Sequence, residues 1–540
     1  MAGFKITQFS GIVPRVPESL LPEHMATIAQ NCDLAYGELR HAKSPFLVSA
    51  LSAAAQSIYT EDGLTFYSWA SDVDAVRAPL AKDNYNRLYF TGDGFKVASR
   101  GNMAPAGGPP PSAYLVGVPR PTVAPTIAAP AATSGSTTET CAYVFVYVNA
   151  YDEPGPPSDP TLVTTDIGST RTLTITKDVM GAYVPLKYAY IYRTPTGSTN
   201  ATYYYVGKVD LTTVAAGATT TFADNVPAAK LAEPLSSLNA YPPPQDLKGL
   251  MALPNGILCA WRANEIWFSD AYRPWSWNPA NVKTTTHNIV GGLAVGSGAV
   301  ITTVTTPYLL SGVSPDAMTA SKINASQAGV SKWAIAQVGD IAIFASHDGL
   351  VTISGASASL AEGQSLFTRD VWRQRCAAGL ATMRFAVWDG RLIAYSSAGA
   401  FTPFMIQFDE ASGVMTELPA FQAACSFTSQ LSDQCYFVNG SNLYQFAGAD
   451  AWSATWQSRE AVTPAPLNLG FAQAVSTGAW TLQLYADGAL VHTENIAADG
   501  TNEFRLPDGY LARRFKLQIT GKGRFRELRM ATTAKDLARV

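Results

Sequence analysis

The sequence has few charges and few of the residues that usually carry catalysis. Of 540 residues, only 15% are Asp, Glu, Lys or Arg, with 38 basic and 41 acidic side chains and five histidines. The formal net charge of −3 argues against a dedicated sequence-reading DNA-binding protein, which normally has a strong basic excess. Such a weakly charged surface suits large permanent contacts better than free diffusion as a cytosolic enzyme.

Cysteine motifs, an export signal and a membrane span are also missing. The six cysteines are scattered without a CxxC pair, so we expect buried free thiols in a reducing compartment, and neither a disulfide framework nor a zinc site. The first 14 residues hold one lysine and no apolar run of signal-peptide length, so we expect no signal-peptide export. The longest apolar stretch, 289–301, contains four glycines and is too short to span a bilayer.

No arrangement typical of an enzyme stands out. Glycoside hydrolysis needs two positioned carboxylates, and no DxE or ExxE pair falls on a predicted strand. Phosphate-binding glycine motifs and a GxSxG elbow are missing, and the histidines are too far apart in sequence to indicate a metal site. The segment 346–349 resembles a sialidase Asp-box only superficially, because no residue separates Asp348 from Gly349, and we interpret it as a hairpin turn. We therefore predict no catalytic residue, no metal and no cofactor.

Strand and turn signals dominate what is present. Short runs of Val, Ile, Tyr, Phe and Thr are bounded by Asp-Gly or Asn-Gly dipeptides, which are typical of β-hairpins. These dipeptides are Asp62-Gly63, Asp93-Gly94, Asn255-Gly256, Asp348-Gly349, Asp389-Gly390, Asn439-Gly440 and Asp487-Gly488. The best helical candidates are 22–31 and 364–376. We predict a mainly β protein.

Two proline-rich stretches suggest how the chain is divided. Residues 101–135 contain eight prolines and are expected to form a linker, and a second break follows at 241–244. The short strands between them, over 136–240, indicate an inserted immunoglobulin- or fibronectin-like β-sandwich.

Turn spacing predicts a β-propeller after the second break. The turns at Asp348, Asp389 and Asn439 are 41 and 50 residues apart, close to the length of a propeller blade, so we assign blades to 245–460. Residues 1–100 would supply an N-terminal motif and the first propeller strands. Residues 461–540 would form a C-terminal β domain with a basic strip.

Two surface features have a possible binding role. Tyr188, Tyr190 and Tyr192 alternate along one predicted strand, either as a stacking face for sugars or bases or as one filled face of a small sandwich. Residues 505–540 carry a net charge of +7, against −10 for the rest, which indicates a solvated face, a docking surface for an acidic partner or a DNA contact. The candidate docking residues are Arg513, Arg514, Lys516, Arg524, Arg526 and Arg529.

The N-terminal segment has the most specific pattern. It reads FSGIVPR over 9–15, LLP over 20–22, ATIAQNCDL over 26–34 and GELR over 37–40. Pro22 suits the first turn of a short helix, Asn31 would end that helix, and Gly37 would turn a hairpin. This succession resembles the opening of the tail nozzle, or tail-tubular-B-like, proteins of short-tailed bacteriophages.

Further segments resemble the same family. They lie at 151–158, 191–194, 266–277, 306–312, 347–351 and 367–372, so that the resemblance extends over most of 5–450 as separated motifs. The residues that carry the motifs are Pro14, Arg15, Leu21, Pro22, Asn31, Gly37, Ser269, Pro274 and Trp275.

The resemblance implies a non-enzymatic structural virion protein. It implies a propeller assembled as a homo-oligomeric ring, commonly of six copies, in the virion tail, assembled in the host cytoplasm. The ring would continue the DNA channel, help retain packaged double-stranded DNA and release it on host attachment, without sequence recognition. Implied partners are the head-to-tail adaptor proteins of the portal complex, and tail fibres or spikes. The alternatives that stay open are a tail-associated propeller that degrades glycans and one that only binds them.

Overall fold

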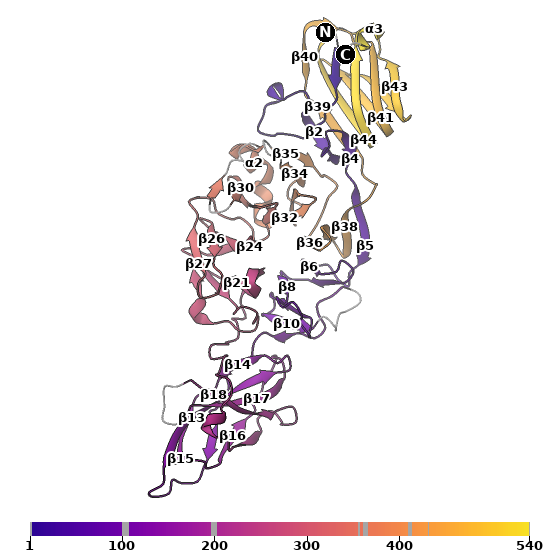
Figure 1. Ribbon diagram of the computed structural model, residues 1–540. Helices are drawn as coiled ribbons and strands as arrows, with labels where there is room; N and C mark the ends of the chain where they lie inside the picture. The colour runs from indigo at the N-terminus through magenta and orange to yellow at the C-terminus, as the bar shows by residue number, and fades with distance from the viewer. Residues whose placement is uncertain are drawn as a thin grey trace.

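A computed structural model gives the fold of the chain, which is 51% strand and 6% helix. The residues that the structure describes are 3–99, 107–195, 202–354, 357–359, 366–408, 413–429 and 431–538. Figure 1 shows an elongated molecule with a β-sandwich at one end, a propeller in the middle, and a second β domain with both termini at the other end. The predicted fold class is therefore confirmed. Among the described residues, no helix combines the length and the apolar character that a bilayer crossing demands.

The propeller has seven blades within the described part of the chain. Five are separate four-stranded sheets, one is the hairpin of β6 and β7, and one consists of β32–β35. In chain order their strands are β6 (Ser57–Thr60) and β7 (Phe66–Trp69); β8 (Ala75–Arg77), β9 (Arg87–Phe90), β10 (Lys96–Ser99) and β11 (Tyr114–Leu115); β20 (Lys248–Leu253), β21 (Ile257–Arg262), β22 (Glu265–Phe268) and β23 (Lys283–Thr284); β24 (Ile289–Val295), β25 (Gly298–Thr303), β26 (Tyr308–Ser311) and β27 (Thr319–Lys322); β28 (Ile335–Val338), β29 (Ile341–Ser346), β30 (Gly349–Ser354) and β31 (Ser357–Ser359); β32 (Met383–Trp388), β33 (Arg391–Ser396), β34 (Phe404–Phe408) and β35 (Gly413–Glu417); and β36 (Cys425–Ser429), β37 (Gln434–Asn439) and β38 (Asn442–Ala449). The last blade takes its fourth strand, β5 (Ser44–Ala50), from near the N-terminus, because β5 pairs antiparallel with β38. This pairing closes the ring.

Every Asp-Gly or Asn-Gly dipeptide singled out above joins two paired antiparallel strands. Asp389-Gly390, for example, links β32 to β33, and both residues have positive φ, 49° and 67°. A turn with two positive φ angles matches the twist of the flanking strands, which explains why Gly is favoured at the second position.

The sandwich lies between β11 and β20 in the chain and so interrupts the propeller. One sheet contains β12 (Thr126–Ala128), β16 (Arg171–Thr176) and β19 (Thr219–Asp224); the other contains β13 (Thr138–Asn149), β14 (Pro154–Pro157), β15 (Thr161–Asp166), β17 (Leu186–Arg193) and β18 (Tyr204–Asp210). The alternation on β13 separates two buried clusters. Tyr143, Phe145 and Tyr147 face the core between the sheets, whereas Val144 and Val146 face a smaller cluster.

The second β domain is built from both ends of the chain. Its long strands are β41 (Phe471–Ala486) and β44 (Ala512–Ala531), with β39 (Ala454–Ser458), β40 (Ala461–Leu467), β42 (Ala489–Ile496) and β43 (Gly500–Arg505) beside them. Four N-terminal strands join this sheet: β1 (Gly3–Ile6), β2 (Ala26–Gln30), β3 (Cys32–Asp33) and β4 (Leu39–His41). Gly478 and Gly523 face each other in the β41–β44 register with φ of 84° and 118°. A Cβ on Gly523 would lie 2.0 Å from the Thr477 carbonyl oxygen, so the close approach of the two strands requires glycine there.

Several boundaries differ from those predicted. The helix expected over 22–31 is wrong, because Ala26–Gln30 is strand β2, paired with β39 and β35. The expected linker 101–135 contains β11, which extends a blade, and β12, which belongs to the sandwich. The N-terminal motif and β39 belong to the C-terminal domain and not to the propeller, since strand pairing across the whole chain outweighs the local pattern. In the expected helix 364–376, Arg369–Cys376 is helix α2, and 364–365 lie outside the described residues.

Candidate functional site: two domain joints and an axial cavity

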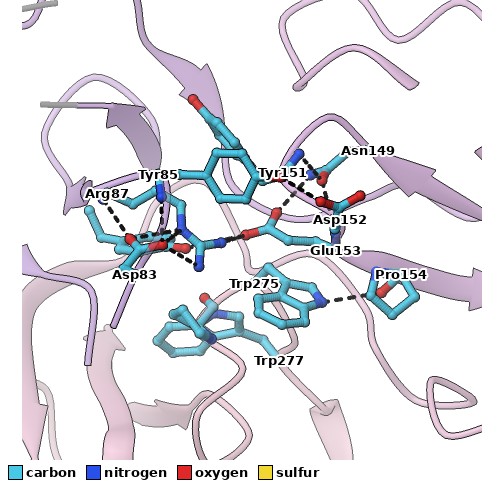
Figure 2. A network of polar contacts seen from close by, with 12 residues as sticks. Asp83, Tyr85, Arg87, Asn149, Tyr151, Asp152, Glu153, Pro154, Trp275 and Trp277 are labelled. Carbon is cyan, nitrogen blue, oxygen red and sulfur yellow. Dashed lines mark hydrogen bonds and ion pairs between the residues drawn. The ribbon is translucent and has the colours of Figure 1, made fainter. Parts of the chain in front are cut away.

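An ion triad joins the propeller to the sandwich (Figure 2). Arg87 on β9 has its Nη1 against Glu153 Oε1, from the segment between β13 and β14, and its Nε and Nη2 each 3.1 Å from Asp83 Oδ1. Glu153 Oε2 accepts a 2.7 Å hydrogen bond from Asn149 Nδ2, and Tyr89 Oη donates to Glu153 Oε1 at 3.3 Å. The side chains of Asp83, Arg87 and Glu153 are only 3%, 4% and 2% exposed.

The triad holds one cation between two carboxylates. Burial, which disfavours the charged form, raises the pKa of Glu153 against the opposing effect of Arg87. Burial also acts to raise the pKa of Asp83, but hydrogen bonds from Arg87 outweigh it and hold that pKa below its ordinary value. The pKa values of the two carboxyls thus shift in opposite directions beside the same guanidinium, since Asp83 also accepts hydrogen bonds from the backbone amides of Arg87 and Tyr85.

Aromatic rings frame the triad. The Arg87 guanidinium lies 5.7 to 5.9 Å from the ring centroids of Tyr85, Tyr151 and Trp275. Trp275 Nε1 donates to the Pro154 carbonyl oxygen of the sandwich at 3.2 Å. Two separately recognised motifs, 151–158 and 266–277, therefore meet at this joint. Of the other motif residues there, Ser269 lies just after β22 with its Oγ accepting from Leu258 N at 2.8 Å, and the Pro274 carbonyl accepts from Trp277 Nε1 at 2.9 Å.

A second joint attaches the C-terminal domain to the blade of β32–β35. Ile12 and Met415 exchange backbone hydrogen bonds of 2.8 and 3.0 Å, Arg15 N donates to the Leu366 carbonyl, and Asn31 N donates to the Glu417 carbonyl. Glu417 also accepts from Gln30 Nε2 at 3.0 Å and from Arg375 Nη2 at 2.5 Å.

Part of the N-terminal motif lies along this second joint. Arg15 and Asn31 make its backbone contacts, and Pro14 precedes the first of them in the chain. Leu21 is buried, and Pro22 accepts from Met25 N through its carbonyl oxygen. Gly37, with φ of 74°, turns between the paired strands β3 and β4 as predicted.

A cavity of about 550 Å³ with a mainly apolar lining lies on the propeller axis, lined by residues of its inner strands. Two carboxylates line it. Asp74 accepts from Gly249 N at 2.7 Å and lies 2.8 Å from Lys332 Nζ, while Glu61 lies 2.8 Å from Arg77. Glycoside hydrolysis needs one carboxyl as proton donor and a second as nucleophile or base. Here both carboxylates have a cationic partner.

The predicted basic strip is stretched along β44 and partly neutralised. Four of its side chains have carboxylate partners: Arg514 with Glu460, Lys516 with Glu18, Arg526 with Glu38 and Arg529 with Glu527. Arg513 and Arg514 lie near one end of the strand, whereas Arg524, Arg526 and Arg529 lie toward the other. The structure therefore does not gather the six candidates into one patch.

The predicted tyrosine face lies on the outer side of the larger sandwich sheet. Tyr188 and Tyr190 stack at 6.1 Å and are half-buried, whereas Tyr192 is buried against Val144 and Val146. Lys208 Nζ lies 4.4 Å from the Tyr188 ring centroid. Part of the face is thus a packed cluster, and part faces solvent.

All six cysteines are free and buried, as predicted. Within the described ranges, no group of three or more His, Cys, Asp or Glu side chains is placed to hold a metal ion.

No protein-family model and no curated protein matches the sequence. Among solved structures, the extracellular domain of the putative hybrid two-component system BT4673 from B. thetaiotaomicron aligns with a TM-score of 0.28 and 9% identity, over 87% of this chain and 47% of that one. The chain thus spans about half the length of that domain. The Dos1 propeller aligns with a TM-score of 0.21, 12% identity and coverages of 75% and 94%. An exo-β-1,3-galactanase from Phanerochaete chrysosporium aligns with a TM-score of 0.18, 8% identity and coverages of 88% and 99%. These similarities are too low to carry an argument about this chain.

Proposed function

We propose that this chain is a structural component of a virion tail, the nozzle of a short-tailed phage, and that it performs no covalent chemistry. The observation that carries the proposal is the position of the motif residues. Arg15, Asn31 and Trp275 make hydrogen bonds across the two joints, which attach a sandwich and a terminal β domain to opposite ends of a propeller. The hydrogen bonds and the ion pair at these joints would break if the domains moved apart, so we propose one elongated body with fixed domain positions.

A rigid subunit suits a ring that must keep a channel aligned. We propose that copies of the chain assemble as a ring, commonly of six, below the head-to-tail adaptor proteins of the portal complex, with tail fibres or spikes as further partners. Subunit contacts should be large and weakly charged, as in obligate interfaces. We place the acidic surplus toward the channel and the basic residues of 505–540 toward an outer partner or the neighbouring subunit. The protein would act in the virion tail after assembly in the host cytoplasm.

The proposal is tested by assembly. The mass of the purified chain is measured alone and after mixing with a portal–adaptor complex, and the mixtures are imaged by negative stain. A ring, or ring formation only on that complex, supports the nozzle. A monodisperse monomer that ignores the complex would overturn it. A reconstruction with Arg513 and Arg514 lining the lumen would overturn the placement of the basic residues but not the ring.

A second candidate function is glycan binding at the sandwich, favoured by the half-exposed Tyr188 and Tyr190 with Lys208 beside them. Stacked tyrosine rings at a surface can carry the apolar face of a sugar. Glycan-array binding that is lost in Tyr190→Ala would support this function, and an array without binding would exclude it for the glycans tested. A hydrolysis assay on host polysaccharide tests the glycan-degrading alternative, for which the ion-paired axial carboxylates give no support.

A further inference from the structure

A separate cavity of about 500 Å³ lies where the propeller meets the C-terminal domain. We call it the interdomain pocket. Trp388, Met405 and Phe446 of the propeller form an apolar wall, and Arg40, Lys43 and Arg524 form a basic wall. Its volume is in the range of pockets that hold a small molecule.

The basic wall contains a like-charged pair. Arg40 on β4 and Arg524 on β44 are direct partners in the strand register. Side chains in such a pair point to the same face of the sheet, and like charges there repel each other. Both side chains line the interdomain pocket, so an anion bound there would reduce the repulsion between them. Local conflicts of this kind concentrate at functional sites.

The surrounding carboxylates leave part of this charge uncompensated. Glu38 lies 2.8 Å from Arg40 but also 3.3 Å from Arg526, so one carboxylate serves two guanidiniums. Asp33, the acidic residue of the pocket lining, is held by Arg391 at 3.0 Å. Lys43 and Arg524 are exposed and form no ion pair within the part of the chain that the structure describes.

His41 adds a ring nitrogen to the basic wall. Its Nδ1 lies 3.0 Å from Gly523 N and 3.4 Å from the Gly523 carbonyl oxygen, and the shorter contact favours the tautomer in which Nδ1 accepts and Nε2 carries the ring proton. That Nε2 is buried and has no hydrogen-bond partner among the described residues, with Asp450 Oδ1 3.5 Å away. A buried donor without an acceptor is costly unless a ligand supplies one.

We propose that the interdomain pocket binds a phosphate group of a small phosphorylated ligand. A phosphate carries more than one negative charge and several acceptor oxygens, which matches two guanidiniums, an ammonium and an imidazole N–H on one wall. The apolar wall then contacts the rest of the ligand. This site is independent of ring assembly, so its failure would leave the nozzle proposal unaffected.

The test uses the full chain in chloride buffer of fixed ionic strength, with inorganic phosphate as the probe. Calorimetric titration is expected to show saturable binding, and phosphate is expected to raise the midpoint of thermal unfolding. Arg524→Ala should weaken phosphate binding about tenfold or more, since one charge-assisted contact is lost. It should also raise the unfolding midpoint in phosphate-free buffer, because the repulsion with Arg40 is removed. Lys43→Ala should weaken binding without that rise.

Arg513→Ala is the matched control, because Arg513 is another exposed arginine of β44 that does not line the pocket. It should leave phosphate binding unchanged. Equal weakening by Arg513→Ala and Arg524→Ala, or no saturable phosphate binding by the unaltered chain, would overturn the proposal. A single-stranded oligonucleotide added as competitor distinguishes the source: displacement of phosphate identifies nucleic-acid phosphate, and its absence identifies a small phosphorylated molecule.

Discussion

The triad at the propeller–sandwich joint makes a sharp prediction for Arg87→Met. The substitution keeps an unbranched apolar stem but removes the cation between Asp83 and Glu153, which are both almost completely buried. Removing one partner of a buried ion pair costs about 3–5 kcal/mol, because the remaining charge is left without compensation. Two carboxylates would remain here, so we expect the loss to reach that range.

The assay is hydrogen exchange followed residue by residue. The amides of Asn149 and Glu153 form hydrogen bonds within the segment that carries the joint. If local opening limits their exchange, a loss of about 3–5 kcal/mol accelerates it by roughly two to four orders of magnitude. Amides in β41 of the C-terminal domain should exchange as in the unaltered chain, which provides an internal control.

Glu153→Gln is the matched variant, because it removes the excess negative charge and leaves Arg87 paired with Asp83. We expect only a small change in exchange at neutral pH. If Arg87→Met opens the joint no more than Glu153→Gln does, the aromatic frame and not the ion triad holds the domains together, and our reasoning is refuted.

The pH dependence of the same pair has a definite sign. The pKa of Glu153 is raised in the folded state above its ordinary value of 4.5, so the native state binds the proton more tightly than the unfolded state does. As the pH falls from above the raised pKa to 4.5, protonation of Glu153 therefore stabilises the folded joint. The stability of the unaltered chain relative to Glu153→Gln should therefore increase as the pH falls through this window. Acidification should likewise slow the exchange of Arg87→Met after correction for the intrinsic rate.

Three further predictions concern other parts of the molecule. Gly523→Ala should lower the midpoint of thermal unfolding of the C-terminal domain, since the added Cβ would lie 2.0 Å from a backbone oxygen. Gly488→Ala, at an open turn, should lower that midpoint much less, and equal effects of the two variants would contradict the requirement for glycine at 523. Arg193→Met should destabilise the sandwich by about 3–5 kcal/mol in urea unfolding, since it leaves Asp224 buried without its 3.0 Å partner, and an unchanged midpoint would contradict this. Burial raises the pKa of the Cys376, Cys425 and Cys435 thiols to about 12. A thiol-reactive dye should therefore label these cysteines only at the rate at which the protein unfolds, and rapid labelling of the native protein would contradict their buried positions.

Local chemistry made the turns and the blades predictable. An Asp-Gly or Asn-Gly dipeptide fixes a tight turn through its own backbone preference, so each predicted hairpin is present. The alternation on β13 predicted a strand correctly, because each of its faces meets a different apolar cluster. The two domain breaks were recognisable only by their proline-rich composition. Their predicted boundaries differ from those of the structure, because β11 pairs with a propeller strand and β12 pairs with a strand of the sandwich.

Pairing between distant segments could not be predicted in the same way. The sequence 26–30 has a helical apolar pattern, but it forms a strand because β39, far along the chain, offers a partner. The triad was missed for a similar reason, since Asp83, Arg87 and Glu153 are unremarkable until the inserted sandwich folds back onto β9. The signal that was available was chemical: Glu153 lies in the loop motif 151–158, which contains no Lys or Arg.

N-terminal strands pair with strands near the C-terminus: β5 pairs with β38, and β1 and β4 pair with β44. The fold therefore cannot close until the C-terminal partners have been synthesised. A ribosome adds about 5–20 residues per second, so β5 waits about 20–80 s for its partner in β38 to be synthesised. The first strands wait still longer, for the last strand of all. A chain cut short by premature termination would keep unsatisfied strand edges at its start, where proteases or chaperones could bind. Completion of synthesis is thus coupled to closure of the fold.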